Sequence, residues 1–358
     1  MAPLSGRPPS GAIDPTDEAK GRFDEGSGGS SARRRGRTVG WLSAAAASLL
    51  SLAILLRSAS PHEILARLGE LSPRALLVAL VWMVLAGVLR GQRLRLLLPG
   101  RPSLRTSYAV AQIYLLITAS VPVGVGEVVA AWLMRRGIDV PIHEGFAAFL
   151  VARVFDVLVL LVLFVAIVGG GFVRLDPRAV QAAWAAAAIL AGLVAVGALH
   201  LRAPEWLPAL LEDRAGRVGG ESRGRKALQL VLRSVARGLR RVPHGRAAAV
   251  IVLLTLGTQL LSFQALHILL RDAGVPASYA SAIFAFAVYV LLRLLPFQGI
   301  GGIGTAAAWW AIAVSFLGVP APDAVAIGAA LYVGFYALLV LLCLTGLVLL
   351  PRRAAQAR

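Results

Sequence analysis

Two apolar stretches of this chain are each interrupted midway by a cluster of proline and glycine. The first runs from Tyr108 to Val121, breaks over Pro122–Glu127 (Pro-Val-Gly-Val-Gly-Glu) and resumes until Met134. A bilayer core about 30 Å thick needs roughly 20 helical residues to cross it, so each arm is short for a span. Proline removes a backbone donor, and polar groups freed at such a break need protein or trapped water around them. The pattern therefore predicts a broken, re-entrant hairpin.

The second interrupted stretch has the same layout. An apolar run from Tyr279 to Leu295 meets the Gly-rich segment Pro296–Gly304, and Thr305 to Phe316 resumes as helix. Counted from a cytoplasmic N-terminus, the first hairpin opens toward the cytoplasm and the second toward the outside. Two oppositely oriented hairpins of this kind suggest an inverted repeat with a binding site near the midplane. If each arm instead crosses the bilayer fully, the chain has about ten spans and the loops keep their sides.

Uninterrupted apolar runs make up most of the remaining chain. Of its 358 residues, 58 % are hydrophobic, and the mean hydropathy is +0.76. We therefore expect an all-α polytopic membrane protein with about six full transmembrane helices plus two broken re-entrant hairpins. The full spans are predicted at 39–56, 75–89, 146–168, 179–199, 247–270 and 324–350. Together these elements define a membrane domain at 39–350.

The two ends of the chain are expected to be short cytoplasmic tails. Residues 1–38 are rich in Gly, Pro, Ser and mixed charge, lack an apolar run and are predicted to be disordered, and 351–358 form the second tail. Arginines before the 39–56 run also resemble the start of a signal peptide, with Ser58-Ala59-Ser60 as a cleavage site. The run exceeds the usual signal core, so an uncleaved first helix is favoured.

The net charge of +18 follows the membrane topology. Basic residues cluster between the apolar runs, where the positive-inside rule places them, and no basic patch with interleaved aromatics occurs elsewhere, so nucleic-acid binding is not expected. The rule assigns 90–105 to a cytoplasmic loop and 57–74 to an outside loop. The prediction is a multi-pass protein of the plasma membrane with cytoplasmic N- and C-termini.

The longest polar segment of the membrane domain, 200–246, carries an amphipathic pattern. One face at a helical period is apolar and the opposite face is basic: Leu228, Val231, Leu232, Val235, Leu239 and Val242 against Lys226, Gln229, Arg233, Arg237, Arg240 and Arg241. Such a helix lies on anionic lipid, so anionic headgroups are expected partners of 223–246. A solvated basic loop explains the same charges.

Four charged residues lie inside membrane-like sequence. Glu127 ends the first break, Arg293 precedes the second, and Arg153 with Asp156 sits in the 146–168 span. Charges in a bilayer cost a few kcal/mol each and are expected to face a protein interior or a wet cavity. Arginine and aspartate at i and i+3 share a helical face, where each partly neutralises the other. A structural ion pair that locks this helix to a neighbour is the alternative.

At these motifs the chain resembles the flippase-like family related to the membrane region of lysylphosphatidylglycerol synthase, also called the multiple peptide resistance factor. The resemblance covers about 39–350 and rests on four motifs in order: Arg90 to Leu98, Pro122 to Glu127, Arg153 with Asp156, and Pro296 to Gly304. The chain departs from the family pattern at Val129-Ala130-Ala131, where relatives tend to have Arg, and at Ala306-Ala307-Ala308, where many have Glu. The soluble synthase domain is not expected here.

The resemblance implies a translocase for an anionic or aminoacylated phospholipid or a polyprenyl-linked glycan, without cofactor, metal or catalytic residue. In this interpretation Arg153 and Arg293 meet a headgroup phosphate, Asp156 orients Arg153, and Glu127 holds an amine or breaks off a protein contact. The expected substrate-binding set is completed by Gly124, Gly126, Gln298, Gly301 and Gly302, although tight helix packing explains the glycines equally well. A membrane-embedded transferase, or a scaffold subunit of a lipid- or glycan-modifying system, remains the alternative. An enzyme partner or a homo-oligomer is compatible with all three.

Overall fold

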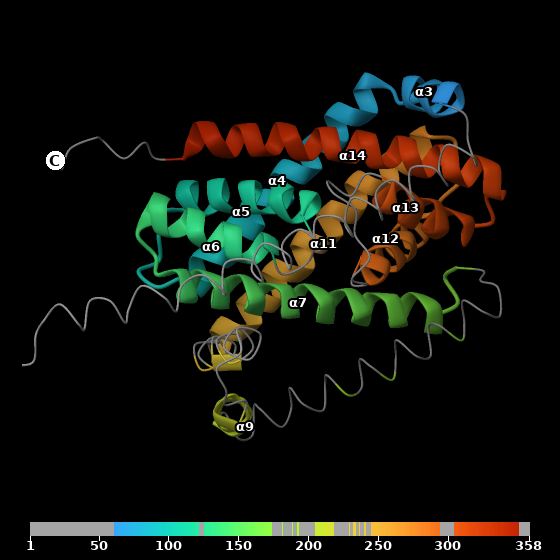
Figure 1. Cartoon of the computed structure of the whole chain (residues 1–358). Helices are drawn as coiled ribbons and strands as arrows, with labels where there is room; N and C mark the ends of the chain where they lie inside the picture. Colours follow the sequence, from blue (N-terminus) through green and yellow to red (C-terminus); the bar gives the residue numbers. More distant parts are fainter. Residues whose placement is uncertain are drawn as a thin grey trace, which may run out of the picture. The chain divides into compact units, whose positions relative to one another are not determined.

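The computed structural model describes residues 61–121, 125–173, 205–217, 245–293 and 304–350, together with isolated residues between 181 and 240. In this part of the chain every regular element is a helix, which confirms the all-α class (Figure 1). The helices are α3 (Pro61–Glu70), α4 (Pro73–Leu97), α5 (Leu104–Ser120), α6 (Val125–Ile138), α7 (Ile142–Gly169), α9 (Trp206–Arg217), α11 (Arg246–Asp272), α12 (Tyr279–Arg293), α13 (Thr305–Ser315) and α14 (Ala321–Leu349).

Four of the described helices are long and apolar enough to cross a membrane: α4, α7, α11 and α14. They have 25 to 29 residues, and they correspond to the spans predicted at 75–89, 146–168, 247–270 and 324–350. The two other predicted spans, 39–56 and 179–199, lie outside the described residues, as do the tails and most of the amphipathic segment. The chain is thus a polytopic membrane protein.

Each interrupted stretch forms two short helices that pack against each other. The first stretch gives α5 and α6, and the second gives α12 and α13. The breaks themselves, at 122–124 and 294–303, lie outside the described residues. The prediction of a helix on each side of each break is confirmed, and re-entry and full crossing stay alternative predictions.

The order of the helices repeats along the chain. A long helix, two short helices and a second long helix occur first as α4 to α7 and again as α11 to α14. Most helix–helix contacts of one half have a counterpart in the other half. For example, α5 packs against α14 as α12 packs against α7, and the two leading helices α4 and α11 pack against each other. This arrangement is typical of a chain built from two like halves, and their opposite orientation across the membrane stays a prediction.

Aromatic stacking anchors the second half around α13. Trp310 is fully buried, and its ring stacks on that of Tyr289 with centroids 4.3 Å apart and planes 13° from parallel. Phe164 of α7 stacks on Phe284 of α12 at 5.4 Å. Aromatic rings bury large apolar areas and fix the relative position of the helices that carry them. Phe286 and Tyr289, on the same α12, reach the cavity described below.

Two segments predicted as loops contain helix, and the side of the membrane on which each lies stays a prediction. Residues 61–70, expected in an outside loop, form α3, which packs against α14. The predicted cytoplasmic loop at 90–105 is helical as far as Leu97, so Arg90, Arg93 and Arg95 lie on α4. The helix continues because Leu94 and Leu97 extend its apolar pattern. The positive-inside rule takes no account of arginines that are neutralised by a carboxylate from another helix.

Candidate functional site

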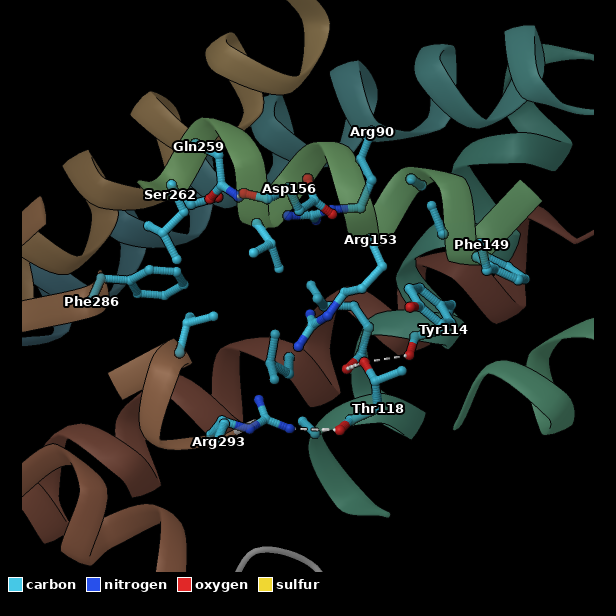
Figure 2. A pocket seen from close by; sticks show the side chains of 18 of the residues that line it. Arg90, Tyr114, Thr118, Phe149, Arg153, Asp156, Gln259, Ser262, Phe286 and Arg293 are labelled. Carbon is cyan, nitrogen blue, oxygen red and sulfur yellow. Dashed lines mark hydrogen bonds between the residues drawn. The ribbon is translucent and has the colours of Figure 1, made fainter. Parts of the chain in front are cut away.

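A cavity of about 120 Å³ lies among the helices of both halves, with lining residues from α4, α5, α6, α7, α11, α12 and α14 (Figure 2). Its wall combines apolar side chains with six charged ones: Arg90, Arg93, Glu127, Arg153, Asp156 and Arg293. The four charged residues singled out from the sequence therefore share one cavity. That they bind a substrate stays a prediction.

Of the remaining residues of the predicted binding set, the structure describes Gly126. Gly124, Gln298, Gly301 and Gly302 lie outside the described residues. Gly126 is described, and it packs against α5 so closely that a Cβ there would lie 2.7 Å from Thr118 Cγ2. The close approach of α6 to α5 explains this glycine, in agreement with the packing alternative.

Asp156 pairs with Arg93 rather than with Arg153. Arg93 Nη1 donates to Asp156 Oδ1 at 2.5 Å, and Nη2 donates to Oδ2 at 3.1 Å, a bidentate geometry that joins α4 to α7. Arg93 also donates to the Thr255 hydroxyl of α11 at 3.0 Å. The expectation that Asp156 orients Arg153 is wrong, because a planar guanidinium facing the carboxylate from another helix offers two parallel hydrogen bonds.

Arg153 extends from α7 into the open part of the cavity, toward Arg293 of α12 (Figure 2). Its Nε is buried and has no hydrogen-bond partner among the described residues. A buried guanidinium donor without an acceptor is costly, so an oxygen-rich partner in the cavity would be favoured.

Arg293 links the two halves of the protein. Its Nη2 donates to the Thr118 carbonyl at 2.7 Å, and its guanidinium lies 5.6 Å from the centre of the Tyr289 ring (Figure 2). Thr118 belongs to the last turn of α5, where carbonyls have no partner within the helix. A cation from the second hairpin thus caps the C-terminus of the first hairpin's leading helix.

Glu127 occupies the first turn of α6, where the helix dipole favours a carboxylate, and it is 6 % exposed. The Tyr114 hydroxyl donates to Glu127 Oε1 at 3.4 Å. The Tyr114 ring in turn stacks on Phe149 of α7, with centroids 4.1 Å apart. The acidic group is therefore positioned on one wall of the cavity by neighbouring helices.

The sequence interpretation missed several polar residues of this cavity, among them Arg90, Arg93, Gln259 and Ser262. Arg90 and Arg93 are three residues apart, as residues on one face of a helix are, and this spacing could have placed them on a continuation of the preceding span. The positive-inside rule instead assigned them to a loop. Gln259 Nε2 lies 3.5 Å from the Asp156 carbonyl. Lone polar groups in apolar helices often serve packing, so the sequence alone could not assign them to a cavity.

The charge of the lining is unbalanced. Four arginines and two carboxylates leave a formal excess of two positive charges in a mostly apolar surrounding. Within the described residues no group of three or more His, Cys, Asp or Glu side chains could hold a metal ion. The chemistry that fits is the binding of an anion through guanidinium hydrogen bonds.

Comparisons with known proteins give one match. The family model described as "Lysylphosphatidylglycerol synthase TM region" matches residues 41–344. No curated protein matches the chain, and no solved structure matches it.

Proposed function

The chain belongs to the lysylphosphatidylglycerol synthase transmembrane-region family, and we propose that it is a translocase for lipids with an anionic headgroup. The family suggests a membrane protein related to lipid or glycan handling. The headgroup would enter the charged cavity while the acyl or prenyl chains stay in the surrounding lipid. In this role the protein is a transporter rather than an enzyme.

One observation carries this proposal: a cavity with six charged side chains lies among helices long enough to span a membrane. A charge at the centre of a membrane helix costs about 2.5–3.5 kcal/mol on insertion scales. The pairing of Arg93 with Asp156 offsets that cost for two of the six. The excess of arginine over carboxylate is unfavourable in the empty protein and favourable once an anion is bound.

The position of the cavity between the halves supports movement of a headgroup. Arg293 is bonded to the Thr118 carbonyl, so a headgroup phosphate that attracts the guanidinium competes with the contact between the two hairpins. Loss of that hydrogen bond frees the end of α5. Binding would therefore favour a rearrangement of one half against the other, which alternating access requires.

The test is lipid exchange between leaflets in vesicles that contain the purified full-length protein and one of two fluorescent anionic lipids, phosphatidylglycerol or phosphatidic acid, quenched from outside by dithionite. Wild type is expected to expose the inner-leaflet dye faster than empty vesicles, and Arg153→Ala combined with Glu127→Ala is expected to slow this about tenfold or more. Arg135→Gln is the control, because Arg135 is exposed on α6 and does not line the cavity. Equal exchange by wild type and the double variant would contradict the proposal.

A further inference from the structure

The volume of the cavity bears on the size of the group that it holds. Its volume of about 120 Å³ is slightly below that of an engineered cavity of about 150 Å³ which is filled by one benzene molecule. A phosphate group fits such a space as it stands, whereas a phosphate carrying a glycerol, an aminoacyl group or a sugar requires the cavity to widen. The volume thus favours a lipid whose phosphate is terminal.

The charge of the lining gives a second, independent criterion. A terminal phosphate is a monoester with a charge of about −1.5 to −2 at neutral pH and three strong acceptor oxygens. A phosphodiester headgroup carries a single negative charge. The formal excess of two positive charges in the cavity matches the monoester.

The arrangement of donors agrees with this charge. The Nη atoms of Arg93 are occupied by Asp156 and Thr255, whereas no ion pair of Arg153 occurs among the described residues; the Nε atoms of both arginines are buried without an acceptor there. Arg153 extends from α7 into the cavity that Arg293 of α12 also lines, where Arg293 reaches the Thr118 carbonyl (Figure 2). Two guanidinium groups facing one small volume suit a ligand with several charged oxygens on one atom.

Resting on the proposed function, we infer that the substrate class of this site is lipids that end in a phosphate monoester, of which phosphatidic acid is the simplest, rather than phosphodiester or aminoacylated lipids. The same monoester chemistry occurs in soluble compounds such as glycerol 3-phosphate, so the test separates the two sources.

The first measurement is binding, because it does not depend on transport. Purified full-length protein in detergent is saturated with radiolabelled short-chain phosphatidic acid, which is then displaced by unlabelled phosphatidic acid, phosphatidylglycerol or glycerol 3-phosphate. Phosphatidylglycerol is expected to require about tenfold more than phosphatidic acid. Equal displacement by the two lipids would overturn the monoester assignment. If glycerol 3-phosphate displaces the label as effectively as phosphatidic acid does, the assignment of the ligand as a lipid is overturned and its assignment as a phosphate monoester is kept.

Variants that change the charge of the cavity give the sharper test. Arg153→Gln lowers the formal excess by one charge and is expected to remove the preference for phosphatidic acid, whereas Arg153→Lys keeps the charge and is expected to retain most of it. Glu127→Gln raises the excess and is expected to tighten phosphatidic acid binding while the amide still accepts from Tyr114. An unchanged lipid preference in both charge-changing variants would overturn the inference, provided that gel filtration shows each to be monodisperse. The Glu127→Gln result stands alone if Arg153→Gln does not fold.

Leaflet exchange then separates this inference from the proposed function. Faster exchange of labelled phosphatidic acid than of phosphatidylglycerol supports both. Exchange of both lipids at one rate overturns the monoester preference and leaves the translocase in place. A tenfold binding preference without any exchange overturns the translocase and leaves the monoester site.

Discussion

The ion pair between Asp156 and Arg93 predicts a different effect of mutation from the Arg153–Asp156 pair that the sequence pattern suggests. Asp156→Leu is expected to destabilise the protein, because it leaves the guanidinium of Arg93, 3 % exposed, without its carboxylate. Adding Arg93→Met to Asp156→Leu is expected to recover much of the loss, since both charges are then gone. Adding Arg153→Met instead is expected to recover less, because Arg153 makes no ion pair with Asp156.

The magnitude follows from the geometry of the pair. Two charge-assisted hydrogen bonds, at 2.5 and 3.1 Å, join the side chains. Removing one partner of a buried ion pair costs about 3–5 kcal/mol, whereas hydrogen-bond couplings between membrane helices reach about 1–2 kcal/mol. Asp156 is 24 % exposed toward the cavity, so the low end applies. We expect a loss of about 3 kcal/mol and a coupling energy between the two residues of about 2 kcal/mol.

The assay is reversible unfolding in mixed detergent micelles, with helicity followed by circular dichroism, for two double-mutant cycles. The first cycle combines Arg93→Met with Asp156→Leu, and the second combines Arg153→Met with the same aspartate change. A coupling energy that is larger for Arg153 than for Arg93 would refute the assignment of the ion pair. The two cycles share one variant, so differences in the denatured state largely cancel.

Two further substitutions test the packing around the site. Gly126→Leu is expected to destabilise the protein by about 1–3 kcal/mol, because its Cβ would collide with Thr118. Gly69→Ala is the control and should not destabilise it, because no atom lies within 4 Å of the added Cβ. The free energy of unfolding is measured for both variants. Asp272→Ala removes the acceptor of the Ser72 backbone N–H at 2.6 Å and of its hydroxyl at 2.9 Å, next to the start of α4, and should cost about 1–3 kcal/mol in the same assay. A loss in Gly69→Ala equal to that in Gly126→Leu, or an unchanged stability in Asp272→Ala, would contradict these contacts.

Most of the membrane architecture could be predicted from the sequence. Span length, apolar composition and the two Pro/Gly interruptions gave four long helices and two pairs of short helices close to their observed positions, including α7 and α11. These features are local: a run of about 20 apolar residues has no stable alternative to a helix in lipid, and a break of proline and glycine disfavours the continuation of a helix.

The sequence also indicated which charges to examine. Glu127, Arg153, Asp156 and Arg293 stand out because a charge among apolar residues is expensive in a membrane. Their meeting in one cavity depends on the contact between α7 and α12, which are far apart in the chain. Periodicity within one helix carries no information on which other helix it will face.

The tertiary structure decided how the charges are paired. Sequence spacing joined Arg153 to Asp156, since residues three apart share a face, but the structure gives Asp156 to Arg93, which lies 63 residues away. A neighbour three residues along the same helix reaches a carboxylate only sideways, whereas a side chain from an opposing helix meets it head-on with two parallel hydrogen bonds. The sequence determined that this protein is a helical membrane protein with charges in its interior. Only the packing of its two halves determined which arginine is neutralised and which one faces the cavity.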